Sequence, residues 1–158
     1  MTGNIEGLPF KIKIDSYHPD RAIVDLKTTK TLDRDYRIFI PDSGERLPFY
    51  EAYGYPLQLA IYREVVRQNT GYVLPCYLAC VDKHTHPICD IIQISDGRLD
   101  DALEEVKRSC EKVIALKSGD IEPIRCEHSD CDYCRDTHEC QLISDEEFEA
   151  HDIERDAI

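Results

Sequence analysis

The sequence KIKIDSYHPDRAIVDLKTT, from Lys11 to Thr29, decides how the rest of the chain is interpreted. Apolar and polar residues alternate in its first and last thirds, an arrangement typical of half-buried strands. Turn-forming residues occupy 16–21 between these runs, so the stretch predicts a β-hairpin. If odd-numbered residues pair with odd-numbered residues across the hairpin, Asp15, Asp25 and Lys27 meet on one surface. A slip of one residue would separate them.

Two carboxylates and one ammonium on a common surface are suited to the hydrolysis of a phosphodiester bond. Asp15 and Asp25 would supply hard oxygen ligands, which Mg²⁺ or Mn²⁺ accepts together with water and phosphate. Lys27 would orient the attacking water or stabilise the charge that develops on the phosphate. The alternative is an ordinary amphipathic hairpin with a solvated polar face, because exposed Asp and Lys are commonplace on strands. The stretch alone leaves both interpretations open.

The order of these residues resembles a known family. Asp15 followed by the tripeptide 25–27, Asp-Leu-Lys, is similar to the Asp…(Asp/Glu)-x-Lys signature of the PD-(D/E)XK nuclease superfamily. The RecB and phage RecE/lambda-exonuclease branch carries Gln-x-x-x-Tyr on a helix after the hairpin, and Gln58 and Tyr62 match that pattern. The resemblance covers roughly residues 7–134.

The resemblance implies a metal-dependent DNA exonuclease of phage or bacterial recombination or repair. Its site would contain Asp15 and Asp25 as Mg²⁺ or Mn²⁺ ligands, Lys27 as a catalytic residue, and Gln58 and Tyr62 as supporting or DNA-positioning groups. Such enzymes have further helices before the hairpin, one of which supplies a Glu or His to the metal. This chain begins almost at the hairpin. We therefore expect a core truncated at its N-terminus, completion by an N-terminal segment or recombination partner protein, or an incomplete ligand shell.

Composition sets limits on this interpretation. The 158 residues are 42% hydrophobic, which suits one folded domain, and no run is long enough to span a membrane. Eight cysteines without a secretory signal favour the reducing cytoplasm. The net charge of −13 argues against DNA binding by the surface as a whole. It leaves room for a local basic groove, because acidic residues crowd the last fourteen positions.

The remaining pattern predicts an α/β domain with a restriction-endonuclease-like core. Residues 49–69 predict a helix that starts or kinks near Pro56, and 96–118 predict a second helix. Residues 72–82 and 88–94 predict two more strands. We expect a small mixed central sheet of about four strands, flanked by these helices.

Four cysteines between residues 126 and 140 form a second group that suggests a metal site. The Cys-x-x-Cys spacing at Cys131 and Cys134 is typical of zinc ligands, and Cys126 and Cys140 would complete a tetrahedral site. Some RecB-like nucleases carry a similar tail that binds a [4Fe-4S] cluster. Free thiols without a metal are the third interpretation.

These patterns divide the chain into a nuclease-like core at 1–122, a cysteine-rich segment at 123–142 and an acidic tail at 143–158. Two further functions remain open. One is a catalytically inactive nuclease-fold module that binds DNA or protein, favoured by the acidic charge and the missing upstream ligand. The other is a metal-stabilised interaction domain built around the cysteine-rich segment.

Overall fold

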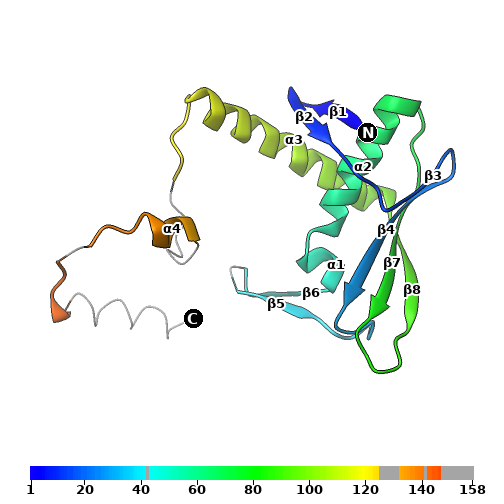
Figure 1. Cartoon of the computed structure of the whole chain (residues 1–158), viewed down its shortest axis with the longest axis horizontal. Helices are drawn as coiled ribbons and strands as arrows, with labels where there is room; N and C mark the ends of the chain where they lie inside the picture. Colours follow the sequence, from blue (N-terminus) through cyan, green and yellow to red (C-terminus); the bar gives the residue numbers. More distant parts are fainter. Residues whose placement is uncertain (42, 125–131, 141, 147–158) are drawn as a thin grey trace. The chain divides into compact units, whose positions relative to one another are not determined.

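The computed structural model describes residues 1–41, 43–124, 132–140 and 142–146. The chain separates into two compact units, Met1–Ile121 and Glu122–Ile158. The first contains a central sheet with helices packed against it (Figure 1). In the second, the structure describes a short helix, α4 (Asp132–Asp136). None of the helices in the described ranges has the length and apolarity that a membrane span requires.

A four-stranded mixed sheet forms the centre of the first unit. Its strand order is β3 (Ser16–His18), β4 (Ala22–Thr29), β7 (Cys76–Asp82) and β8 (Cys89–Ile94). β4 runs parallel to β7, whereas β3 and β8 are antiparallel to their neighbours. The predicted small mixed sheet is therefore confirmed, with β4 in a central position.

Two helices lie between β4 and β7 in the chain, as a parallel strand pair requires. They are α1 (Phe49–Ala52) and α2 (Tyr55–Thr70). The break between them lies at Gly54, which adopts a left-handed conformation with φ 64°, and Pro56 follows within the first turn of α2. The single helix expected from residue 49 is thus two helices, and the proline marks the start of the longer one.

The helices cover one face of the sheet. Leu59, Ala60 and Val66 of α2 are fully buried in the main core with apolar residues of β4 and β7. α3 (Asp96–Ser118) packs mainly on α2, with Leu99 joining the same core. On the other face of the sheet, large apolar side chains remain exposed, among them Leu26, Val81 and Ile91.

Two small hairpins were not expected from the sequence. β1 (Thr2–Ile5) pairs with β2 (Leu8–Lys11) at the start of the chain, and Ile5 packs against α3. β5 (Ile38–Ile40) pairs with β6 (Glu45–Leu47) between β4 and the first helix. Strands of three or four residues carry too little alternation to stand out in the sequence.

The central hairpin is displaced toward the C-terminus relative to the prediction. β2 ends at Lys11, residues 12–15 belong to no strand, and the strand that pairs with β4 is the short β3. Tyr17 pairs with Ile23, so odd-numbered residues do pair with odd-numbered residues. This register places Asp15, which directly precedes β3, on the side of the sheet occupied by Asp25 and Lys27.

Candidate active site

β4 buries the face that carries its charged residues. Ile23 and Asp25 are 0% and 1% exposed, whereas Leu26 is 59% exposed. The apolar alternation of the strand would predict the reverse, with Leu26 inside. Asp25 can be buried because Lys27 and a polar residue of α2 lie against its carboxylate.

Asp25, Lys27 and Gln58 form a compact polar network beneath α2. The Lys27 Nζ lies 2.7 Å from Asp25 Oδ2 and donates to Gln58 Oε1 at 2.9 Å. The Gln58 Nε2 lies 3.4 Å from Asp25 Oδ1 in a long hydrogen bond. The side chain of Lys27 is 18% exposed, so its ammonium retains access to the surface. Three of the predicted site residues thus lie in direct contact.

Tyr62 and Tyr55 extend this network along α2. Gln58 Nε2 also lies 2.7 Å from the Tyr62 hydroxyl, which donates to the Lys13 carbonyl at 3.1 Å. The Tyr55 ring lies under Lys27, with Nζ 4.4 Å from the ring centroid. The i, i+4 spacing of Gln58 and Tyr62 therefore directs both toward the site, as the sequence predicted.

Asp15 approaches the same site from the start of β3. Its Oδ2 accepts a hydrogen bond from the Leu26 N–H at 3.0 Å, which fixes the carboxylate beside β4. The negative charge of Asp15 contributes to the raised pKa of Asp25. Asp15 is exposed, whereas Asp25 is buried. The structure therefore brings together all five residues for which the sequence predicted a role in phosphodiester hydrolysis.

Burial and charge shape the protonation of this cluster. Burial raises the pKa of Asp25 above its ordinary value; Lys27 counteracts this rise, and the Asp15 carboxylate adds to it. Burial disfavours the Lys27 ammonium, but Asp25, Tyr55 and Tyr62 outweigh burial and raise the pKa of Lys27. Burial raises the pKa of the nearby Cys80 to about 11, so this thiol stays neutral and is a poor metal ligand.

The donor set has the chemistry of a divalent metal site. Asp25 Oδ2 is buried and has no hydrogen-bond partner in the described part of the chain, so its short contact with Lys27 is ionic and poorly directed. The Leu26 N–H occupies only Oδ2 of Asp15, so the other carboxylate oxygen is a further possible metal ligand. Within the described ranges no set of three or more His, Cys, Asp or Glu converges on one point. Asp15 and Asp25 are hard oxygen donors of the kind that divalent cations accept, and two carboxylates alone would leave most of such an ion's ligand positions to other oxygens.

The proposed zinc or iron–sulfur site falls largely outside the described residues. Cys126 and Cys131 lie in the segment 125–131, which is not described, whereas Cys134 is buried and Cys140 is exposed. The acidic tail beyond residue 146 lies outside the described residues as well. The cysteine site therefore stays a prediction. Of the cysteines in the central sheet, Cys76 and Cys80 are buried and Cys89 is exposed.

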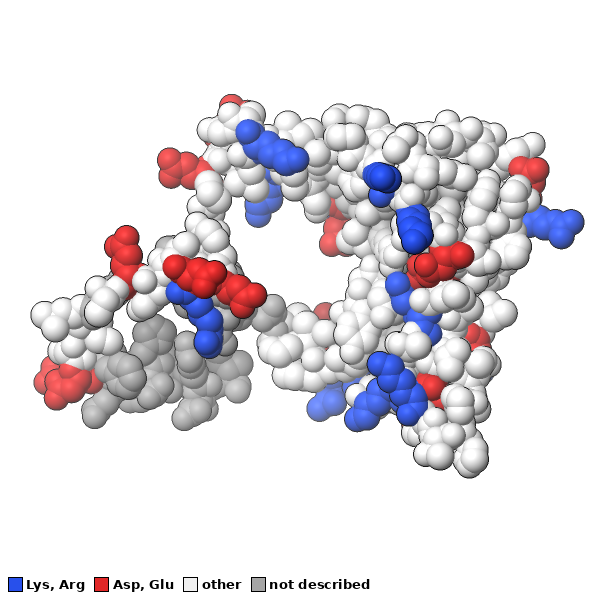
Figure 2. All heavy atoms as spheres, in the orientation of Figure 1, with Lys and Arg blue, Asp and Glu red and all other residues white. Residues whose placement is uncertain are grey.

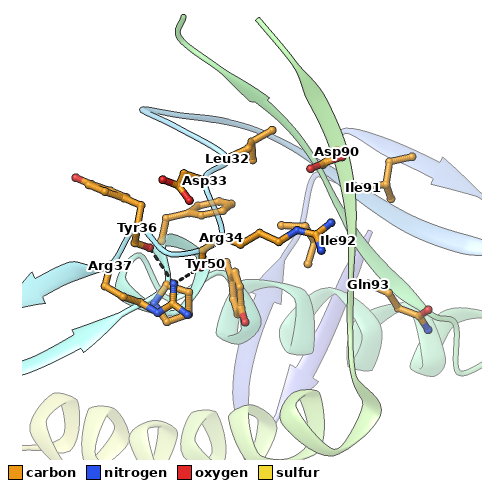
Figure 3. A pocket seen from close by; sticks show the side chains of 12 residues that line it. Leu32, Asp33, Arg34, Tyr36, Arg37, Tyr50, Asp90, Ile91, Ile92 and Gln93 are labelled. Carbon is orange, nitrogen blue, oxygen red and sulfur yellow. Dashed lines mark hydrogen bonds between the residues drawn. The ribbon is translucent and has the colours of Figure 1, made fainter.

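A separate cavity of about 480 Å³ lies between the 32–37 loop, the start of α1 and β8. Arg34 extends across it toward β8, and Arg37 is held by the backbone carbonyls of Arg34 and Tyr36 (Figure 3). Asp33 and Asp90 also line it. None of the five predicted site residues does, so this cavity is not the candidate active site.

Comparisons with known proteins support a nuclease-like fold. A crystal structure of a protein from Eubacterium rectale, described as "Putative exonuclease", is 39% identical with a TM-score of 0.81. The match covers 95% of this chain and 55% of that protein, so the chain spans about half of that protein's length. A comparison with curated proteins finds no match.

A family model matches residues 1–137, which include every helix and strand named above. Its description is a PDDEXK-like domain of unknown function (DUF3799). The matched residues include Asp15, Asp25 and Lys27. The chain therefore belongs to this family of PDDEXK-like domains.

Proposed function

We propose that this chain hydrolyses phosphodiester bonds in DNA with the help of Mg²⁺ or Mn²⁺. The observation that carries the proposal is the convergence of Asp15, Asp25 and Lys27 at one end of the hydrogen-bonded network beneath α2. Asp25 is buried with its carboxylate against the Lys27 ammonium, so a charged carboxylate can be held at this position. Membership of a PDDEXK-like family adds support.

Each residue has a distinct part in this proposal. Asp15 and Asp25 would hold the ion, which when bound supplies polarisation of the phosphate and activation of water. Lys27 would orient the attacking water and stabilise the negative charge on the phosphate. Gln58 would fix the Lys27 ammonium, and Tyr62 would fix Gln58.

We further propose that the reaction is exonucleolytic and serves DNA recombination or repair in a phage or bacterium. The description of the Eubacterium rectale protein as an exonuclease supports this mode of cleavage. Exonucleolytic action predicts that linear DNA is degraded while closed circular DNA stays intact. The remaining ligands of the ion would come from substrate, water, or a segment beyond this chain.

The direct test compares degradation of linear DNA with Mg²⁺ or Mn²⁺ by wild type, Asp25→Asn and Lys27→Met. Loss of one charge-stabilising donor is expected to lower the rate by about 10² to 10³-fold. Asp20→Asn is the matched control, because Asp20 is an exposed carboxylate in the turn before β4, at a positive φ that Asn accepts. Equal activity of all four proteins would refute the assignment, provided that thermal unfolding shows each variant to be folded.

A second candidate function is a catalytically inactive module that binds DNA. The observation in its favour is that only two carboxylates converge among the described residues, without a third ligand. This candidate predicts that wild type binds linear DNA but leaves it intact with either metal. Hydrolysis that depends on Asp25 would exclude it.

A further inference from the structure

A basic pocket lies next to the candidate active site. It has a volume of about 540 Å³, within the range of ligand sites, and is formed where β4 and β7 end near the break between α1 and α2. We define the basic pocket by its seven lining residues, Thr28, Thr29, Lys30, Tyr53, Tyr55, Lys83 and His84.

The charge of the basic pocket is opposite to that of the chain. The sequence contains 32 acidic and 19 basic residues, yet the described residues lining the pocket include two lysines, one histidine and no Asp or Glu. Figure 2 shows several Lys and Arg side chains on the face of the first unit where β4, α1 and α2 meet, with some Asp and Glu side chains among them. Such a local concentration attracts phosphate despite the negative net charge.

The Tyr55 side chain connects the basic pocket with Lys27. Tyr55 contacts the Lys27 ammonium on one side and lines the pocket on the other. The Tyr53 ring follows, with its centroid 5.8 Å from that of Tyr55 and tilted by 32°. Tyr53 is 60% exposed, so its ring is available for stacking.

The turn that carries Lys83 and His84 is held in place. The Lys83 N–H donates to the Thr29 carbonyl at 3.0 Å, which fastens the turn to the end of β4. The buried Asp82 accepts from the Ile88 N–H at 3.1 Å and lies 3.9 Å from His84 Nε2. The cationic groups therefore project from a backbone that needs little ordering when a ligand binds.

The cavity of Figure 3 is a weaker candidate for the same role. It also has arginines and tyrosines, but Asp33 and Asp90 share its lining. Arg37 is already bonded to two backbone carbonyls. Two acidic residues therefore share the lining of this cavity, whereas no Asp or Glu is among the described residues that line the basic pocket.

We propose that the basic pocket binds the nucleotide next to the scissile phosphate on a single DNA strand. Lys30 and Lys83, with His84, would contact the backbone phosphate, and the base would stack on Tyr53. This inference rests on the proposed function, because it takes the scissile phosphate to lie at Asp15, Asp25 and Lys27. It names a part of the substrate site that the family signature does not include.

The first test measures binding of a short fluorescent oligodeoxythymidylate in EDTA, where no hydrolysis occurs. Lys30→Ala with Lys83→Ala is expected to weaken affinity at least about tenfold at low salt. It should also reduce the slope of log K against log salt by about 1.4, as loss of two contacts to a single strand requires. The matched control, Lys112→Ala with Lys117→Ala on exposed positions of α3, removes the same charge outside the pocket. Equal losses in both variants would overturn the inference.

The second test addresses stacking. Tyr53→Leu is expected to weaken oligonucleotide binding about 5- to 100-fold, whereas Tyr53→Phe retains a ring and should bind like wild type. Tyr72→Leu is the control, because Tyr72 is 53% exposed and lies outside the pocket. If Tyr53→Leu binds as well as Tyr72→Leu, the base does not stack here and the proposal fails.

The two proposals can fail separately. If wild type does not hydrolyse DNA but the pocket variants lose oligonucleotide binding selectively, the nuclease function fails and the binding site stands. If Asp25→Asn abolishes hydrolysis but the pocket variants bind like wild type, only the nucleotide subsite is wrong.

Discussion

Gln58 connects the polar side chains of the candidate site. Its amide accepts from Lys27 and contacts both Asp25 and the Tyr62 hydroxyl. Leucine has a similar volume but none of these bonds. We expect Gln58→Leu to lower the rate of DNA hydrolysis about 10- to 100-fold, as loss of supporting hydrogen bonds does around metal sites.

The change should appear in kcat more than in KM, because Gln58 positions Lys27 rather than holding substrate. Gln93→Leu, an exposed glutamine on β8, serves as the control. A Gln58→Leu enzyme with unchanged kcat would show that Lys27 needs no such support.

Single residues also show which features of the candidate site the sequence predicts and which it does not. Asp15, Asp25 and Lys27 were predicted to share a surface, and they do, because the register of β3 and β4 pairs odd positions. The burial of Asp25 was not foreseen. Alternation shows that the two faces of a strand differ, but helix packing decides which face is covered, and here α2 covers the polar one.

At the scale of elements, the break between α1 and α2 positions both tyrosines of the basic pocket. Gly54 has φ 64° and no atom within 4 Å of the place that a Cβ would occupy. We expect Gly54→Ala to lower the free energy of unfolding by about 1–2 kcal/mol, from backbone strain alone. Chemical denaturation would measure this.

Gly97→Ala is the matched control. Gly97 lies in the first turn of α3, has no positive φ and likewise has open space around it. Alanine there should stabilise the protein by about 0.5–1 kcal/mol. If Gly54→Ala and Gly97→Ala change the free energy of unfolding in the same direction, the left-handed conformation does not explain the need for glycine at position 54.

Helices whose ends are marked by characteristic residues were predicted well. α3 spans the predicted 96–118, and Gly119 ends it in a left-handed conformation; Ser95 occupies the N-cap position but its side chain makes no capping hydrogen bond. The β1–β2 hairpin was missed because its pairing depends on contacts with α2 and α3, which are distant in sequence. The zinc or iron–sulfur interpretation of the cysteine-rich segment remains a prediction.

For the whole molecule, the raised pKa of Asp25 links stability to pH and metal. A carboxyl whose pKa is raised by folding contributes stability below its ordinary pKa of 3.8, and this contribution is lost as pH rises through the raised value. A divalent cation binds the ionised form and offsets that loss, so metal stabilisation should increase with pH over the same window.

At ten times its Kd, Mg²⁺ or Mn²⁺ should stabilise the protein by about 1.4 kcal/mol, or about 3–6 °C in Tm. Thermal unfolding with and without metal, at neutral pH and near pH 4, would measure the shift. Asp25→Asn should abolish it, and Asp20→Asn should preserve it. A shift that is independent of pH would place the metal elsewhere.

The most direct measurement is a Mn²⁺ titration followed by the electron paramagnetic resonance signal of the free ion. It compares wild type, Asp15→Asn, Asp25→Asn and the double variant. If both carboxylates hold one ion, each single change removes the same site and the double change removes nothing more. Wild-type stoichiometry and affinity in Asp15→Asn would contradict the shared site.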